Sequence, residues 1–219
     1  DVGVGVLANE AYANSPAELR ADPRGRRGGW YDCDICPNKP GGLEYIGQVL
    51  GQWFDCCADL EPRYVSIWPY DQGGCGCADC QPWGSRGFLT AAESAAALAR
   101  QKMPGVNVIL ATWMFDETEW GGLAQAFTQT TPWCDYLLAE ETTRDMPAGL
   151  PRIGFPEISM YEMFPWGGFG ATPLPRHFQR QWDAARTHLV GGFPYSEGIY
   201  EDINKVLFSQ FYWSNRPAQ

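Results

Sequence analysis

Six short apolar runs alternate with helix-like segments along this 219-residue chain, and this alternation limits its fold more than any other feature. The runs are rich in β-branched and aromatic residues and are too short for helices, so each predicts a strand. The predicted strands are residues 2–7, 64–68, 106–112, 135–139, 152–155 and 190–193. Parallel strands need a crossover connection, which a helix supplies. The pattern therefore predicts an α/β fold built from βα units.

The segments between the strands carry apolar residues at the spacing of amphipathic helices. The predicted helices are residues 41–60, 88–103, 118–128, 175–189 and 200–213. Thr90 is the expected N-cap of the second of these, which Pro104 and Gly105 end. In the fourth, Phe178, Trp182, Ala185 and Leu189 share one side. A chain of this length is expected to form a single domain over residues 1–219, with a sizeable core.

Composition and charge exclude several classes of function. The formal net charge is -10 and no cluster of Lys or Arg offsets it, which argues against nucleic acid and anionic membranes as partners. No apolar run approaches the roughly 18 residues of a membrane span. No strand is followed by a G-x-G-x-x-G or G-x-x-x-x-G-K-[ST] turn, so nucleotide binding is disfavoured.

Acidic residues follow the predicted strands. They are Glu10, Asp71, Asp116, Glu117, Glu140, Glu141, Glu157 and Glu197. In a (β/α) barrel these positions converge on the carboxyl-terminal mouth, where active sites lie. Cleavage of a glycosidic bond needs two carboxyl groups, one to protonate the leaving oxygen and one as nucleophile or base. The alternative is a purely structural role, in which Asp116, Glu117 or Glu197 only caps the helix that follows it.

These acids predict a carbohydrate-active hydrolase acting on an oligo- or polysaccharide, with no cofactor needed for the chemistry. Asp71 and Glu157 are the first-choice catalytic pair, with Glu197 and Glu140 in reserve. Trp83, Trp120 and Trp166 lie beside Gly or Pro, where an indole can form a flat platform for a sugar. The expected substrate contacts are Trp68, Trp113, Asp116, Trp120, Trp166 and Tyr195.

Eight cysteines require a separate explanation. Two C-x-x-C pairs, Cys33 with Cys36 and Cys77 with Cys80, would together make a four-sulfur structural zinc site, leaving Cys75 spare. The alternative is a set of disulfides that includes Cys56, Cys57 and Cys134. Disulfides would place the protein in a secreted or periplasmic compartment. Both alternatives stay open, and neither makes the cysteines catalytic.

The stretch from Tyr70 to Cys80, YDQGGCGCADC, has an Asp-containing turn followed by a C-x-C-x-x-C-like loop. With the strand entry PGVNV at 104–108 and the aromatic run before Asn215-Arg216-Pro217, it resembles poorly characterised glycoside-hydrolase-like domains. Those domains are TIM barrels distantly similar to the family 20 β-hexosaminidases. That family carries an Asp-Glu pair where this chain has Asp71-Gln72, so the resemblance leaves the general acid to Asp71 or to another strand.

The resemblance implies a TIM-barrel-like fold in which about six βα units are visible, the third to the eighth. Two strands would then be missing, so the chain is either a fragment or is completed by a missing segment or a second copy.

Two other functions stay open. One is a non-catalytic glycan-binding or scaffold module on the same fold. The other is a metal-dependent enzyme with Asp71, Glu140 and Glu157 as oxygen ligands.

Overall fold

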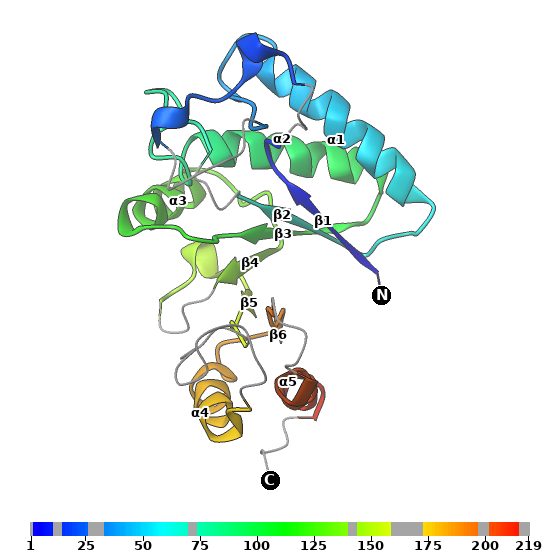
Figure 1. The fold of residues 1–219 in the computed structure, drawn as a ribbon, viewed down its shortest axis with the longest axis vertical. Coiled ribbons are helices and arrows are strands. Elements are labelled where there is room, and N and C mark those ends of the chain that lie inside the picture. The colour runs from blue at the N-terminus through cyan, green and yellow to red at the C-terminus, as the bar shows by residue number, and fades with distance from the viewer. Residues whose placement is uncertain are drawn as a thin grey trace. The chain divides into compact units, whose positions relative to one another are not determined.

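A computed structural model gives the fold of residues 2–10, 15–25, 33–69, 74–139, 144–158, 173–196 and 202–214. Strands and helices alternate as predicted (Figure 1). The strands are β1 (Gly3–Leu7), β2 (Tyr64–Trp68), β3 (Asn107–Ala111), β4 (Tyr136–Ala139), β5 (Arg152–Gly154) and β6 (Gly191–Gly192). The α-helices are α1 (Gly42–Ala58), α2 (Gly87–Lys102), α3 (Glu117–Gln129), α4 (Pro175–Ala185) and α5 (Asp202–Ser214). Short 3-10 helices are η1 (Ala17–Leu19), η2 (Pro23–Gly25) and η3 (Pro147–Gly149).

The six strands follow one another in the sheet in the order of the sequence, β1-β2-β3-β4-β5-β6. This is the order of a (β/α) barrel, whose strands are laid down one after another, and a complete TIM barrel has eight. The predicted α/β, incomplete TIM-barrel-like fold is therefore confirmed. That a further segment or a second copy completes the barrel stays a prediction, as does the single domain over 1–219.

The chain divides into two compact units. One comprises Asp1–Leu137 and Met146–Leu150, and the other Leu138–Asp145 and Pro151–Gln219. In the first unit β1, β2 and β3 pair in parallel, with Val65 opposite Val4 and Val108. Ile67 lies opposite Val6 and Leu110 in the same way, and all of these apolar side chains are buried except that of Val4, which is half-buried. This register holds the carboxyl ends of the three strands at one edge.

Helices α1 and α2 lie side by side over this part of the sheet (Figure 1). After the first turn, the buried residues of α2 are all alanine, at Ala91, Ala92, Ala95, Ala96 and Ala99. Small side chains let the helix approach the strands closely. Thr90 does not cap this helix as expected. The helix begins earlier, after Arg86, and the Thr90 hydroxyl donates to the Arg86 carbonyl from inside the first turn (2.9 Å).

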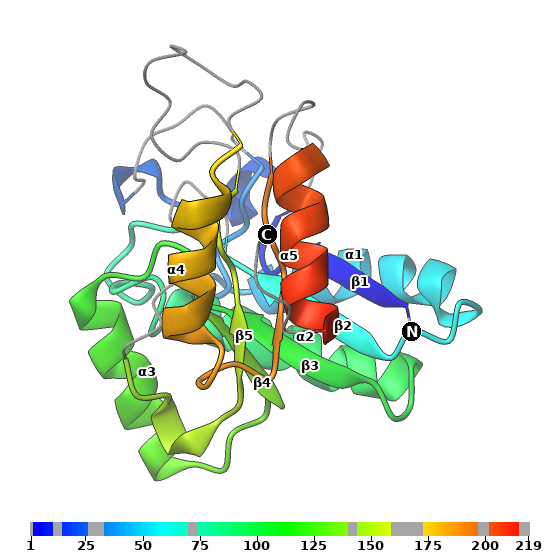
Figure 2. The same cartoon turned by 90° about the horizontal axis from the view of Figure 1, so that it is seen from below.

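The second unit has its own apolar core. Strands β5 and β6 pair in parallel, and α4 and α5 flank them (Figure 2). The core is formed by Ile158, Phe178, Trp182, Phe208 and Phe211. The indole of Trp182 stacks on the ring of Phe211 with centroids 5.5 Å apart. The predicted apolar side of α4 is thus confirmed, although the helix ends at Ala185 and Leu189 packs on the core from beyond it.

The start of α3 is fixed by two carboxylates. Asp116, the N-cap, accepts a hydrogen bond from the Glu119 amide (2.8 Å), and Glu119 accepts one from the Asp116 amide (2.9 Å). The second oxygen of Glu119 accepts from the amide of Gly84, 35 residues earlier (2.8 Å). Glu119 is almost completely buried. Its side chain therefore satisfies amides of two separate segments at once.

No helix in the described ranges is long and apolar enough to cross a membrane.

Replacing Glu119 with Ala should lower the free energy of unfolding by about 1–3 kcal/mol, because two amides lose their acceptor in a buried place. Glu119→Gln should lower the free energy of unfolding by less than Glu119→Ala does, since its single carbonyl oxygen can accept from only one of the two amides. Thr118→Ala, in the exposed first turn of the same helix, is the control and should change stability by less than about 0.5 kcal/mol. Urea unfolding followed by circular dichroism measures all three. Equal effects of Glu119→Ala and Thr118→Ala would contradict this role.

Candidate functional site

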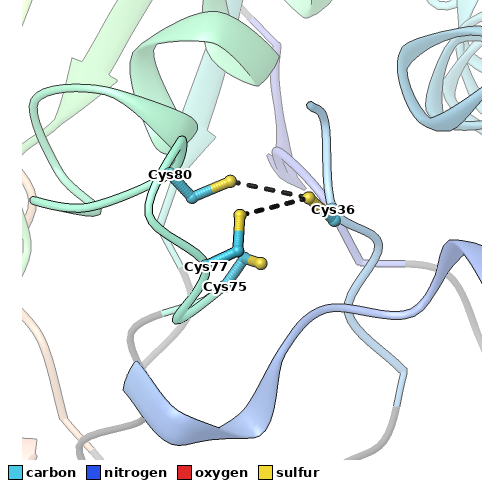
Figure 3. A group of neighbouring side chains, drawn as sticks. All are labelled: Cys36, Cys75, Cys77 and Cys80. Atoms are coloured by element: carbon cyan, nitrogen blue, oxygen red, sulfur yellow. Dashed lines mark hydrogen bonds between the residues drawn. The ribbon is translucent and has the colours of Figure 1, made fainter. Parts of the chain in front are cut away.

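The described part of the chain brings four cysteine thiols together: Cys36, Cys75, Cys77 and Cys80. Their Sγ atoms all lie within 4.8 Å of one another. The Sγ of Cys36 is 3.6 Å from that of Cys80 and 3.8 Å from that of Cys77. Figure 3 shows Cys77 and Cys80 pointing toward Cys36, which comes from a separate segment. Three of the four are buried and Cys77 is half-buried.

A tight turn brings Cys77 and Cys80 to the same side of the chain. The amide of Cys80 donates to the carbonyl of Cys77 (3.0 Å), and the amide of Gln81 donates to the same oxygen (3.2 Å). The Gln81 side-chain amide holds the carbonyl of Cys75 (2.8 Å). Gly76, between the cysteines, donates its amide to the carbonyl of Asp22 (2.7 Å). The loop after β2 is thereby fixed to the segment around Asp22.

Cys36 reaches the cluster from an extended segment, and this geometry excludes Cys33. Asp34 and Ile35 form antiparallel bridges with Glu10 and Arg20. Side chains alternate along extended backbone, so residues three apart point to opposite sides. The Sγ of Cys33 accordingly lies beside the carboxylate of Glu10 (3.8 Å). The cluster thus differs from the set expected from the C-x-x-C spacing: Cys75, expected to be spare, takes the place of Cys33.

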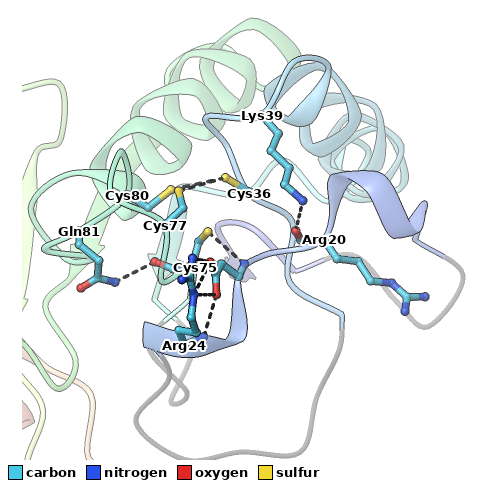
Figure 4. Close-up of polar contacts among 9 residues, drawn as sticks. Arg20, Arg24, Cys36, Lys39, Cys75, Cys77, Cys80 and Gln81 are labelled. Atoms are coloured by element: carbon cyan, nitrogen blue, oxygen red, sulfur yellow. Dashed lines mark hydrogen bonds and ion pairs between the residues drawn. The ribbon is translucent and has the colours of Figure 1, made fainter.

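N–H groups point at the sulfur atoms. The backbone amide of Asp22 donates to the Sγ of Cys75 (3.2 Å), and the side-chain amide of Asn38 donates to the Sγ of Cys80 (3.3 Å). The same Asn38 nitrogen also donates to the carbonyl of Asp79 (3.0 Å). Figure 4 shows Cys75 beside the segment that carries Arg20 and Arg24, with the Lys39 ammonium on the carbonyl of Arg20 (2.7 Å).

The environment divides the cysteines by their acidity. A hydrogen bond from the Cys80 thiol, supported by the amides of Cys77 and Asp22, lowers the pKa of Cys75 to about 5. The same bond to Cys75 and burial raise the pKa of Cys80, and burial raises that of Cys36 to about 11. Outside the cluster, burial and the nearby charges of Asp34 and Glu10 raise the pKa of Cys33 to about 11. A thiolate at neutral pH is therefore favoured at Cys75 and disfavoured at Cys33.

All eight cysteines are free thiols in the structure. The two sulfur separations at Cys36 are far longer than the roughly 2.05 Å of a disulfide bond. The disulfide alternative thus finds no support here, whereas the grouping is compatible with a structural metal.

Of the acids predicted to form the catalytic machinery, Glu157 is described, while Asp71, Glu140 and Glu197 lie outside the described residues, as does Trp166. Glu157 follows β5 and is half-buried. Its backbone bridges in parallel to Tyr195, which follows β6. The amide of Tyr195 donates to the carbonyl of Pro156 (2.9 Å), and its ring lies 5.2 Å from that of Phe155. Within the second unit, Glu157 and Tyr195 are thus neighbours at the ends of adjacent strands.

Glu10 follows β1 and lines a cavity of about 490 Å³ between this strand and α1. Leu7, Val49 and Trp53 are among the other residues of its wall. The sequence predicted no substrate contact here, and the side chain of Trp53 is 47% exposed.

The expected sugar contacts have different surroundings. Trp68 ends β2 and Trp113 follows β3, and both are half-buried. Trp120 is instead a core residue of α3, 7% exposed and edge-on to Phe115. Trp83 is likewise buried. Neither indole presents a free face, because each is almost completely buried. Asp116 caps α3, which was the alternative to a role in substrate binding.

The approach of α1 to the cluster depends on glycine at position 42. A Cβ there would lie 2.1 Å from the carbonyl oxygen of Cys36, whereas one at Gly47, in the same helix, would meet nothing within 4 Å. We expect Gly42→Ala to displace Cys36 and to cost about 1–3 kcal/mol of stability. Gly47→Ala is the matched control and should stabilise by about 0.5–1 kcal/mol. Thermal unfolding of both variants checks this, and a neutral Gly42→Ala would contradict it.

No protein-family model and no curated protein matches the chain. Solved structures of glycoside hydrolases do share its fold. A family 89 glycoside hydrolase from Clostridium perfringens in complex with PUGNAc superposes with a TM-score of 0.59 at 14% identity, covering 100% of this chain and 25% of that chain. The catalytic domain of β-amylase from Paenibacillus polymyxa superposes with a TM-score of 0.53 at 9% identity, covering 99% of this chain and 82% of that chain.

The same Clostridium perfringens protein, with substitutions E483Q and E601Q, matches in complex with its substrate GlcNAc-α-1,4-galactose (TM-score 0.58, 13% identity, 100% of this chain and 25% of that chain). The chain thus spans about a quarter of the length of this neighbour. At such identities the likeness shows the fold alone, a glycoside-hydrolase-like barrel fold, and it does not specifically show family 20.

Proposed function

We propose that this protein is a carbohydrate-active enzyme that hydrolyses glycosidic bonds. The observation that carries the proposal is the position of carboxylates just past the strands of a fold shared with two different glycoside hydrolases. Among the described residues, Glu10 and Glu157 have this position after β1 and β5, while Asp116, after β3, caps α3. In barrel enzymes this edge of the sheet carries the catalytic residues.

The proposed chemistry uses two carboxyl groups. Asp71 gives its proton to the oxygen of the leaving sugar as the glycosidic bond breaks. Glu157 either attacks the anomeric carbon, forming a glycosyl-enzyme that water then hydrolyses, or takes a proton from the attacking water. The first route retains the anomeric configuration and the second inverts it. Glu197 and Glu140 are the reserves for either role. Paired carboxylates need no cofactor, so the cysteine cluster has no part in this reaction.

Aromatic side chains near these acids are proposed to bind the sugar. Tyr195 is the best placed, because it lies in a half-buried position on the strand end next to Glu157. Trp68, at the end of β2, and Trp113, just past β3, are further proposed sugar contacts. Packing fixes the orientation of a half-buried aromatic ring, and an ordered ring of this kind suits stacking on a pyranose. The proposed partner is accordingly an oligo- or polysaccharide.

The test is hydrolysis of a glycan panel by the wild type and by Asp71→Asn and Glu157→Gln. The panel contains 4-nitrophenyl glycosides and GlcNAc-α-1,4-galactose, the substrate of the family 89 neighbour. Each substitution should lower kcat/KM at least about 100-fold, because each removes a proton-transfer or nucleophilic group. Asp79→Asn is the control, since Asp79 is exposed in the cysteine loop and should leave activity unchanged.

Full activity in both variants would reject the assignment of the pair. A wild type that binds glycans from the panel, as measured by calorimetry, without cleaving any would instead support the glycan-binding alternative. Proton NMR of the first product released from an active wild type separates the two roles of Glu157, because its anomeric configuration reports retention or inversion.

A further inference from the structure

We propose that Cys36, Cys75, Cys77 and Cys80 bind one Zn²⁺ ion as a structural site of four thiolates. The proposal rests on the arrangement of the four Sγ atoms, on the N–H groups that surround them, and on the two chain segments they join. It is independent of the proposed hydrolase activity, because none of these residues takes part in that chemistry.

The sulfur separations fit a tetrahedral ion. With Zn–S bonds of about 2.3 Å, the corners of a regular tetrahedron lie about 3.8 Å apart. The Sγ of Cys36 is 3.8 Å from that of Cys77 and 3.6 Å from that of Cys80, and all four sulfur atoms fall within 4.8 Å. Four thiolates match the ligand preference of Zn²⁺ and complete its coordination. Because no position is left for water or substrate, the site is structural and not catalytic.

The atoms around the sulfurs suit thiolates rather than neutral thiols. The amide of Asp22 and the side-chain amide of Asn38 donate to Cys75 and Cys80, respectively. Such N–H···S bonds spread the negative charge that four thiolates bring to one ion, and groups in this position orient metal ligands. Asn38 also holds the Asp79 carbonyl inside the Cys77–Cys80 turn, so a single side chain orients both the sulfur and its loop.

The ion would cross-link two helix starts. Cys36 lies just before α1, whose Gly42 packs against the Cys36 carbonyl. Cys80 lies just before α2, whose Gly87 packs against the Cys80 side chain. These segments are 44 residues apart in the sequence, and the two helices pack on each other. The expected effect of the metal is therefore on the stability of the first unit.

Metal analysis of the purified, reduced protein should give one zinc per chain. Replacing zinc with Co²⁺ adds a readout that needs no variant, since four-thiolate tetrahedral cobalt shows intense sulfur-to-metal charge-transfer bands and visible d–d bands. Chelation should lower the midpoint of thermal unfolding, because a structural metal contributes its binding energy to folding. Reduced protein that takes up no zinc, or an octahedral cobalt spectrum, would overturn the proposal.

Serine substitutions test the ligand set. Cys75→Ser should lower zinc affinity at least about 10-fold in competition with a chromophoric chelator, a loss comparable to that from disturbing ligand-orienting groups. Cys33→Ser is the matched control and should keep full affinity, since its sulfur lies beside Glu10. The reverse result, with zinc lost in Cys33→Ser and kept in Cys75→Ser, would refute this ligand set.

Asn38→Ala should weaken zinc binding about 10- to 100-fold while leaving all four ligands in place. Its cobalt spectrum should keep the charge-transfer bands, which distinguishes a positioning role from loss of a ligand. Unchanged affinity would remove Asn38 from the site.

Unreduced protein should also contain eight titratable thiols after chelation and denaturation, whereas a disulfide among the four cysteines would contradict the metal site.

Discussion

The first unit depends on the parallel register of β1, β2 and β3. Val65 lies between Val4 and Val108, and Ile67 lies between Val6 and Leu110, so each strand places its apolar side chains in line with those of its neighbours. A slip of one residue would turn every one of these side chains to the opposite face. The strand ends are therefore fixed by the core, and the loops that follow them must begin at the same edge.

Two kinds of side chain follow the strands at that edge. Carboxylates follow the strands, and the cysteine loop follows β2 a few residues later. The cysteine cluster is built on backbone contacts from three segments, at Asp22, Cys36 and the 75–81 loop. Loops of this kind are stable because their polar groups are satisfied internally.

The sequence predicted the fold well because the strands and helices are local patterns. The five helices and six strands agree with their predicted ranges to within a few residues, apart from the end of α4. The errors concern properties that no local pattern contains. Thr90 suits a cap, but α2 starts one turn earlier. Cys33 has the spacing of a metal ligand. Backbone bridges to Glu10 and Arg20, however, hold its segment in an extended conformation, which turns Cys33 away from Cys36. Trp120 sits beside glycines like a loop platform, yet packing against Phe115 makes it core.

The buried carboxylate of Glu119 makes the start of α3 and the chain around Gly84 a single cooperative element. Local opening of either segment leaves a buried charge without part of its hydrogen bonding, so neither can open alone at low cost. Gly84 is also the last glycine before α2, a few residues beyond Cys80. The hydrogen bond from Gly84 to Glu119 therefore ties the segment between the cysteine loop and α2 to an acid far away in the sequence.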